Sequence, residues 1–159
     1  MENTNIIFSK TDYKKYLEKL VYLEKDRIFC RHNLEHFIDV ARICTILCYE
    51  NKVDFDKDLV YSAALLHDIG RIKEIEDGTR HEIASAELAP HFLAATKFSD
   101  QDKEKIISLI KNHRNKKNPD KSLEKMFYMA DKLSRYCFRC PARDKCTWSD
   151  EKKNLTIKY

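Results

Sequence analysis

Apolar side chains recur at helical spacing along most of the chain. His36, Val40, Ile43 and Leu47 stand at positions i, i+4, i+7 and i+11, which places them on one side of a helix over residues 32–50. Similar stripes predict helices over residues 12–24, 56–68, 79–95 and 121–135, and another that runs from residue 99 to about 113. The periodicity ends at about residue 136. The pattern therefore predicts six helices followed by a non-helical tail.

Polar and special residues suggest where these helices begin and end. Asp56 and Ser99 are typical N-cap residues, and Thr79 with a glutamate three positions later reads as a capping box. Gly70 is expected to stop the helix that begins at Asp56. Pro90 is expected to kink or end the helix in which it lies.

The composition supports an all-α protein. The chain of 159 residues holds only 2 Gly and 3 Pro, too few for the tight turns of an all-β fold or for a glycine-rich nucleotide loop. This length predicts one main domain, residues 1–135, with a short appendage, residues 136–159. No apolar run approaches the roughly 20 residues that span a bilayer, so no membrane partner is expected.

Charge and cysteine content indicate which partners and which cellular environment the protein is expected to have. Residues 1–96 hold 13 Lys/Arg and 17 Asp/Glu, a net charge of −4, whereas residues 97–159 hold 17 and 9, a net charge of +8. A basic second half favours an anionic substrate or nucleic acid. The six cysteines read as reduced thiols, and the first residues do not resemble a signal peptide, so a cytoplasmic location is expected.

Ionisable residues interrupt the apolar stripes at positions where packing alone would exclude them. A buried carboxylate costs several kcal/mol unless a cation or hydrogen bonds satisfy it, so a metal explains such residues economically. Nitrogen and oxygen ligands of this kind suit Fe, Mn, Zn, Ni or Co. The candidate ligands are His36, His67, Asp68, His81, His113 and Asp131.

The order of these residues resembles the HD superfamily of metal-dependent phosphohydrolases. That family has a histidine, a later His-Asp pair and a distant aspartate, on separate helices of an all-α bundle. His36, the pair His67-Asp68 and Asp131 match this signature, and the resemblance covers roughly residues 20–135. It implies an HD-domain helical bundle with an irregular, cysteine-rich C-terminal tail.

The resemblance also implies a ligand set and a reaction. His36, His67, Asp68 and Asp131 would hold one divalent transition metal; Asp68 would bridge to a second metal held by His81 and His113. Asp68 would be catalytic, and so would Arg71, which matches a position where several HD families contact phosphate. The implied substrate is a small phosphorylated molecule, a nucleotide above all, and the implied attacking group is a metal-activated hydroxide.

The tail carries a second candidate site. Cys137, Cys140 and Cys146 follow the pattern C-x2-C-x5-C, whose first gap lets two thiolates reach one metal. Three thiolates and a further ligand would hold zinc or an iron–sulfur cluster, and Cys30 is a candidate for the fourth ligand. Cys44 and Cys48, one helical turn apart, are interpreted as core thiols.

Three other functions compete with the phosphohydrolase. Two-iron HD oxygenases have a similar six-ligand site. The tail with its basic surroundings would also suit a non-catalytic nucleic-acid-binding or regulatory protein, but nucleic-acid binding is not favoured. The stretch His32 to His36 also reads H-x-x-E-H, a zinc-protease pattern, but that function leaves the pair His67-Asp68 unexplained. His32 and Glu35 are therefore interpreted as helix-start surface residues or as the lining of a substrate pocket.

Overall fold

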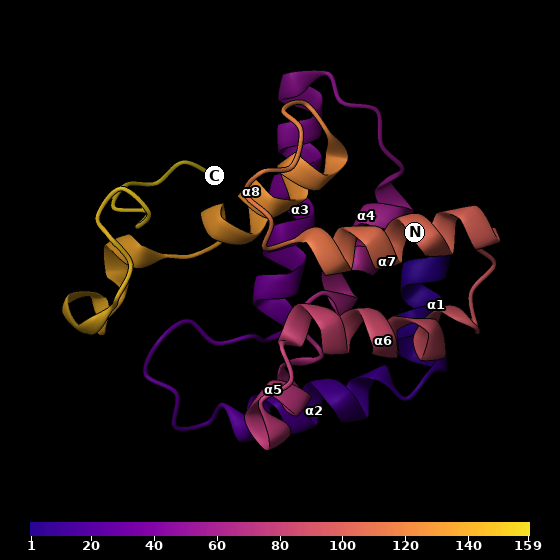
Figure 1. Ribbon diagram of the computed structural model, residues 1–159, viewed down its shortest axis with the longest axis horizontal. Helices are drawn as coiled ribbons and strands as arrows, with labels where there is room; N and C mark the ends of the chain where they lie inside the picture. The colour runs from indigo at the N-terminus through magenta and orange to yellow at the C-terminus, as the bar shows by residue number, and fades with distance from the viewer.

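A computed structural model describes residues 1–159 as a bundle of α-helices without a strand (Figure 1). The all-α prediction is therefore confirmed, although eight α-helices form where six were predicted. The sequence pattern missed the first helix and the short fifth helix, neither of which has a long apolar stripe. The helices are α1 (Glu2–Lys10), α2 (Tyr13–Leu23), α3 (Leu34–Asn51), α4 (Lys57–Leu66), α5 (Arg71–Asp77), α6 (His81–Leu93), α7 (Asp100–Asn112) and α8 (Leu123–Leu133).

The long helix α3 lies at the centre of the bundle. It packs against α4 and α8, while α7 packs against both α4 and α6, and α1 covers α4 (Figure 1). Phe37, Leu66, Phe92 and Phe127 are fully buried in the core. No helix is both long and apolar enough to cross a membrane.

Side-chain caps hold several helix starts in place. The predicted caps Asp56 and Ser99 accept hydrogen bonds from the backbone N–H groups three residues on, at 2.9 and 3.2 Å, so both predicted helix starts are confirmed. The capping box at Thr79 is wrong. Helix α6 begins after Arg80 without a side-chain cap, because the Thr79 N–H donates to Asp77 Oδ1 at 2.9 Å and Glu82 turns towards arginines.

Gly70 does not act as the predicted left-handed stop. Its φ of −69° is helical, and it precedes α5 directly. A Cβ atom at this position would lie 2.3 Å from the backbone nitrogen of Ser85 in α6, so glycine is needed for close approach of two segments. Gly78 is the left-handed residue, with a φ of 81° at the end of α5.

The tail lies at one end of the bundle, beyond α8 (Figure 1). It contains two short 3₁₀ turns, Cys137–Arg139 and Arg143–Lys145, where the sequence pattern indicated no helical structure. Asn154 fastens the tail to the end of α8 by donating hydrogen bonds to the carbonyl oxygens of Lys132 and Arg135, at 2.8 and 2.9 Å.

Candidate metal centre

The six candidate ligands converge from the ends of five helices. One histidine lies in the first turn of α3, the His-Asp pair directly follows α4, another histidine begins α6, another caps α7, and the last aspartate lies near the end of α8. All six side chains are buried. The arrangement brings together His36, His67, Asp68, His81, His113 and Asp131.

Two ligand groups share one carboxylate, Asp68. His36, His67, Asp68 and Asp131 offer ligand atoms that all lie within 4.8 Å of one another, and Asp68, His81 and His113 form a second such group. Asp68 Oδ2 lies 3.2 Å from His67 Nε2 and 3.6 Å from His36 Nε2. Asp68 Oδ1 lies 3.3 and 3.6 Å from the Nε2 atoms of His81 and His113. Each carboxylate oxygen thus faces the imidazoles of a different ligand group, which is the arrangement that a bridging carboxylate requires.

Backbone carbonyl groups fix the tautomers of two histidines. His67 Nδ1 donates to the carbonyl oxygen of Ala64 at 2.8 Å, and His113 Nδ1 donates to that of Ile110 at 2.6 Å. A carbonyl oxygen can only accept, so the proton must reside on Nδ1. The Nε2 atoms therefore point into the site, as in metal-bound histidines.

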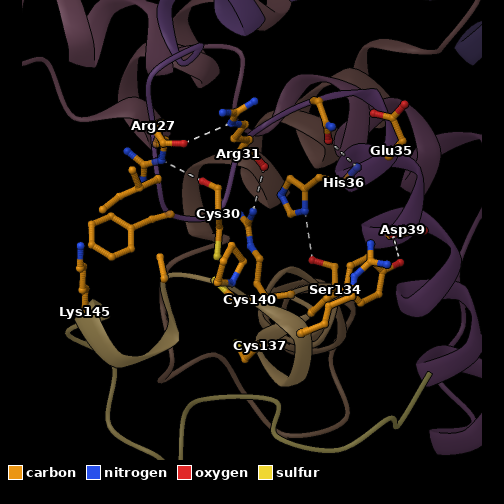
Figure 2. A pocket seen from close by; sticks show the side chains of 18 of the residues that line it. Arg27, Cys30, Arg31, Glu35, His36, Asp39, Ser134, Cys137, Cys140 and Lys145 are labelled. Carbon is orange, nitrogen blue, oxygen red and sulfur yellow. Dashed lines mark hydrogen bonds between the residues drawn. The ribbon is translucent and has the colours of Figure 1, made fainter.

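Side chains orient the other two histidines in the same way. Ser134 Oγ donates its proton to the carbonyl oxygen of Asp131 at 2.8 Å, so His36 Nδ1 donates to Ser134 Oγ at 3.1 Å (Figure 2). His81 Nδ1 lies 2.9 Å from Glu74 Oε1 and 3.1 Å from Arg71 Nη1, and these two side chains hold its ring. The Nε2 atoms of both histidines point towards Asp68.

Three polar atoms at the centre are buried without a hydrogen-bond partner: His36 Nε2, His67 Nε2 and Asp68 Oδ1. Such groups are rare in native proteins because each costs free energy unless it is satisfied. Divalent cations at the two ligand groups would satisfy all three, and the donor set of imidazole nitrogens and carboxylate oxygens suits a transition metal. The residues present therefore fit a bound divalent metal.

The charge states also suit a cation. Burial opposes ionisation of Asp68 and Asp131, but neighbouring histidines and Lys132 outweigh it and hold both pKa values well below the usual range. Burial lowers the pKa of His36 to about 3. Burial also disfavours charge on His67, yet Asp68 and Asp131 raise its pKa to about 9. Binding of a metal at His67 Nε2 would release this proton.

A cavity of about 260 Å³ opens above the centre. Asp68, His81, His113 and Asp131 form its base. Seven basic side chains surround it, which favours an anionic ligand over a cationic or apolar one. They are Arg27, Arg71, Arg114, Lys132, Arg135, Arg143 and Lys153.

Comparison with known proteins agrees with this geometry. The HD domain profile matches residues 33–136. The chain belongs to the HD domain family. It is 43% identical to an uncharacterized protein of Clostridium beijerinckii over the whole length of both. It is 33% identical to ribonuclease Y of Lawsonia intracellularis over 107 residues, which is 67% of this chain but only 19% of that enzyme.

A solved structure shares the HD fold. The crystal structure of a predicted HD superfamily hydrolase from an uncultured Thermotogales bacterium superposes with a TM-score of 0.61. The match covers 91% of this chain and 82% of that one, at 22% sequence identity. The likeness extends beyond residues 33–136 and places the early helices within the same overall fold.

The HD centre has a further histidine that sequence reasoning did not assign to it. His32 is buried, its Nδ1 lies 2.7 Å from Glu24 Oε1, and its Nε2 lies 3.6 Å from Asp68 Oδ2. The interpretation of His32 as pocket lining is therefore right, and its interpretation as a surface residue is wrong. Glu35 is exposed, as a surface residue would be. His32 also precedes α3, so His32 and His36 do not share a helix as the protease pattern requires.

Arg71 lies on the cavity wall but is held by carboxylates. Its Nε is 3.3 Å from Glu24 Oε1, and its Nη1 is 3.1 Å from Glu74 Oε2. The same two glutamates contact His32 and His81. Arg71 thus links the residues that orient two histidines of the HD centre.

Proposed function

We propose that this chain is a metal-dependent phosphohydrolase that cleaves a phosphoester or phosphoanhydride of a small, nucleotide-like substrate. The observation that carries the proposal is Asp68, whose two oxygens face the imidazole nitrogens of two different ligand groups beneath a basic cavity. Paired cations joined by a carboxylate and a pocket for an anion are the components of metal-assisted phosphate hydrolysis. The similarity to ribonuclease Y, whose name denotes cleavage of RNA, supports the same class of bond.

In this proposal His36, His67, Asp68 and Asp131 hold one metal, and Asp68, His81 and His113 hold a second. Metals bound there supply Lewis acidity and a hydroxide at neutral pH. Fe, Mn, Zn, Ni and Co all suit this donor set.

The chain's own basic residues bind and orient the substrate. Arg135 contacts both carboxylates of the centre, with Nη2 3.3 Å from Asp131 Oδ1 and 3.9 Å from Asp68 Oδ2. A phosphate at this position would take bidentate hydrogen bonds from a guanidinium group. Arg71, which also lines the cavity, is already paired with Glu24 and Glu74. It would bind phosphate only by sharing its N–H donors with these two carboxylates.

His32 has a positioning role in this scheme. Glu24 fixes its ring through Nδ1, so its Nε2 can accept a hydrogen bond from a water molecule or substrate hydroxyl bound over Asp68. Both oxygens of Glu24 accept from His32, Oε1 from the ring and Oε2 from the backbone N–H, so Glu24→Gln would keep one acceptor and remove the other together with the charge that holds the ring. We expect it to lower kcat more than it changes KM.

The test is cleavage of nucleotides, dinucleotides and short RNA by protein loaded with Mn, Fe or Co, with the nucleotide products and any free phosphate separated by chromatography. Asp68→Ala should reduce cleavage to background, because it removes the one carboxylate that both ligand groups share. Asp54→Ala, at an exposed carboxylate, is the matched control and should leave activity unchanged. Arg71→Ala should mainly raise KM.

Two outcomes would contradict the proposal. A metal-loaded protein that cleaves no member of the panel but consumes oxygen with an organic substrate would be an HD oxygenase. A protein inactive in both assays that shifts nucleic acid in a salt-dependent manner would be a binding protein.

A further inference from the structure

Four of the six cysteines gather beside the HD centre although they lie far apart in sequence. Cys30 precedes α3, whereas Cys137, Cys140 and Cys146 belong to the tail. All four line the cavity above Asp68 and Asp131. A neighbouring cavity of about 740 Å³ also runs between residues 26–31 and the tail, and Figure 2 shows the Cys30 side chain reaching from the first segment towards the second.

The tail backbone forms three successive tight turns, and its three cysteines stand at positions 137, 140 and 146 along them. The Cys140 N–H donates to the Cys137 carbonyl, the Arg143 N–H to that of Cys140, and the Cys146 N–H to that of Arg143, each at 3.2 Å. These turns keep the segment from Cys137 to Cys146 compact, and all three of its cysteines line the cavity that Cys30 also lines.

Packing does not explain why the tail is ordered. Its buried apolar residues are Cys137 and Ala142, and neither belongs to the hydrophobic core cluster. By contrast, Cys44 and Cys48 are fully buried within that cluster. All six cysteines are free thiols, so no disulfide joins the tail to the loop before α3.

Basic side chains surround the four cysteines. Arg27, Arg135, Arg143 and Lys153 line the same cavity as the four cysteines, and nearby cations stabilise the thiolate form that binds metals. Burial raises the pKa of Cys30, Arg135 opposes this rise, and the sulfur atoms of the three tail cysteines add to it. The four thiols are therefore near enough to influence one another electrostatically.

We propose that Cys30, Cys137, Cys140 and Cys146 hold a four-thiolate metal centre that fastens the tail over the mouth of the HD site. No three of the four sulfur atoms lie within 4.8 Å of one another, unlike the ligand atoms of the two histidine–carboxylate groups. A single tetrahedral zinc, with Zn–S bonds of about 2.3 Å, would hold its sulfur atoms about 3.8 Å apart. The wider spread favours an iron–sulfur cluster, whose thiolates bind different iron atoms.

Such a centre would shape the substrate cavity through Arg135. This side chain contacts Asp131 and also donates from Nη1 to the carbonyl oxygen of Arg31, next to Cys30, at 3.2 Å. Cross-linking residue 30 to the tail would therefore hold the guanidinium over the HD metals. Loss of the cysteine centre should raise KM for an anionic substrate while the HD metals remain bound.

The first experiment measures iron, zinc and acid-labile sulfide in the full chain purified without oxygen. Asp68→Ala provides the background, because it empties the HD site and leaves the cysteines intact, so failure of the proposed hydrolase activity would not affect the result. We expect about four iron and four sulfide per chain in this background, with broad visible absorption. Adding Cys30→Ser or Cys140→Ser should remove most of both, whereas Cys44→Ala, the matched core control, should not.

A second measurement needs no variant. Cys30, Cys140 and Cys146 are partly exposed, so an alkylating reagent should label them quickly if they are free thiols. We expect the native protein to resist labelling at all three until the metal is removed by a chelator, with peptide mass spectrometry as the readout.

Three results would overturn the inference or its cluster assignment. Rapid labelling of these cysteines in the native protein, or equal metal and sulfide content in Cys30→Ser and Cys44→Ala, would show that they are not ligands. Zinc without sulfide, lost in Cys30→Ser, would refute the cluster and assign a zinc centre to the same four thiolates.

Discussion

Replacing Gly70 with alanine tests how closely α6 must approach the chain beside the HD centre. The added Cβ would lie 2.3 Å from the Ser85 nitrogen, 2.6 Å from the His81 carbonyl oxygen and 2.7 Å from the Ala84 carbonyl carbon. All three are backbone atoms of α6, so no side chain can rotate out of the way. Ordinary contact begins at 3.4 Å, so Ser85 must retreat by about 1.1 Å.

The cost follows from two contributions. Overpacking of this kind destabilises proteins by about 1–3 kcal/mol. The retreat also stretches the hydrogen bond from the Gly70 N–H to Ser85 Oγ, now 2.8 Å long, which contributes about 1 kcal/mol. We expect a total of about 3 kcal/mol, which lowers the Tm of a chain of this length by about 6–12 °C.

Gly78→Ala is the matched control. The new Cβ would meet nothing within 4 Å, so its cost comes from the positive φ of 81° alone. That cost is about 1 kcal/mol, or about 2–4 °C in Tm.

Calorimetry and metal analysis of both variants check the prediction. Gly70→Ala moves the first turn of α6, which carries His81, so it should lose metal at the group of Asp68, His81 and His113. Gly78→Ala should keep its full metal content. A Gly70→Ala protein that melts no lower than Gly78→Ala would refute the reasoning that close packing requires glycine here.

Further variants and conditions test the remaining interactions. Tyr13 Oη donates to the Leu65 carbonyl oxygen at 2.7 Å within the core, so Tyr13→Phe should cost about 1 kcal/mol, seen as a Tm lower by about 2–4 °C. Burial raises the pKa of Asp58, but hydrogen bonds from Thr4 and Asn3 outweigh it and lower the pKa below 3.8. The ionised Asp58 carboxylate therefore stabilises the fold fully above pH 3.8, and this stabilisation is lost as the pH falls through the lowered pKa of the folded state. In urea titrations, the free energy of unfolding of Asp58→Asn should therefore fall less on acidification than that of the parent. A metal held at 100 times its Kd adds about 2.7 kcal/mol, so chelation should lower the Tm of the parent by about 5–10 °C, and an unchanged Tm would argue against a resident metal.

Local sequence determined much of the secondary structure. The caps Asp56 and Ser99 each bond to a backbone N–H three residues away, a distance at which sequence spacing alone decides contact. The apolar stripe of α3 likewise follows from helical geometry, which places every third or fourth residue on one side. For the same reason His36 and Asp131 could be recognised as polar residues on buried faces.

Local patterns failed where a neighbouring segment competed for the same group. Thr79 matches a helix cap by spacing, but Asp77 takes its N–H and α6 begins two residues later. Gly70 looks like a helix stop, yet its absent side chain matters because α6 packs against it.

The site itself was decided by tertiary structure. Sequence named six ionisable residues, but only the packing of five helix ends brings their ligand atoms within bonding range of common cations. The sequence pattern did not place His32 at the metal centre, because its partner Glu24 and its neighbour Asp68 lie 8 and 36 positions away along the chain. Helical periodicity carries no information about contacts between residues so far apart. Cys30 meets the tail for the same reason: a contact across more than a hundred residues depends on how helices pack, which spacing along the chain does not specify.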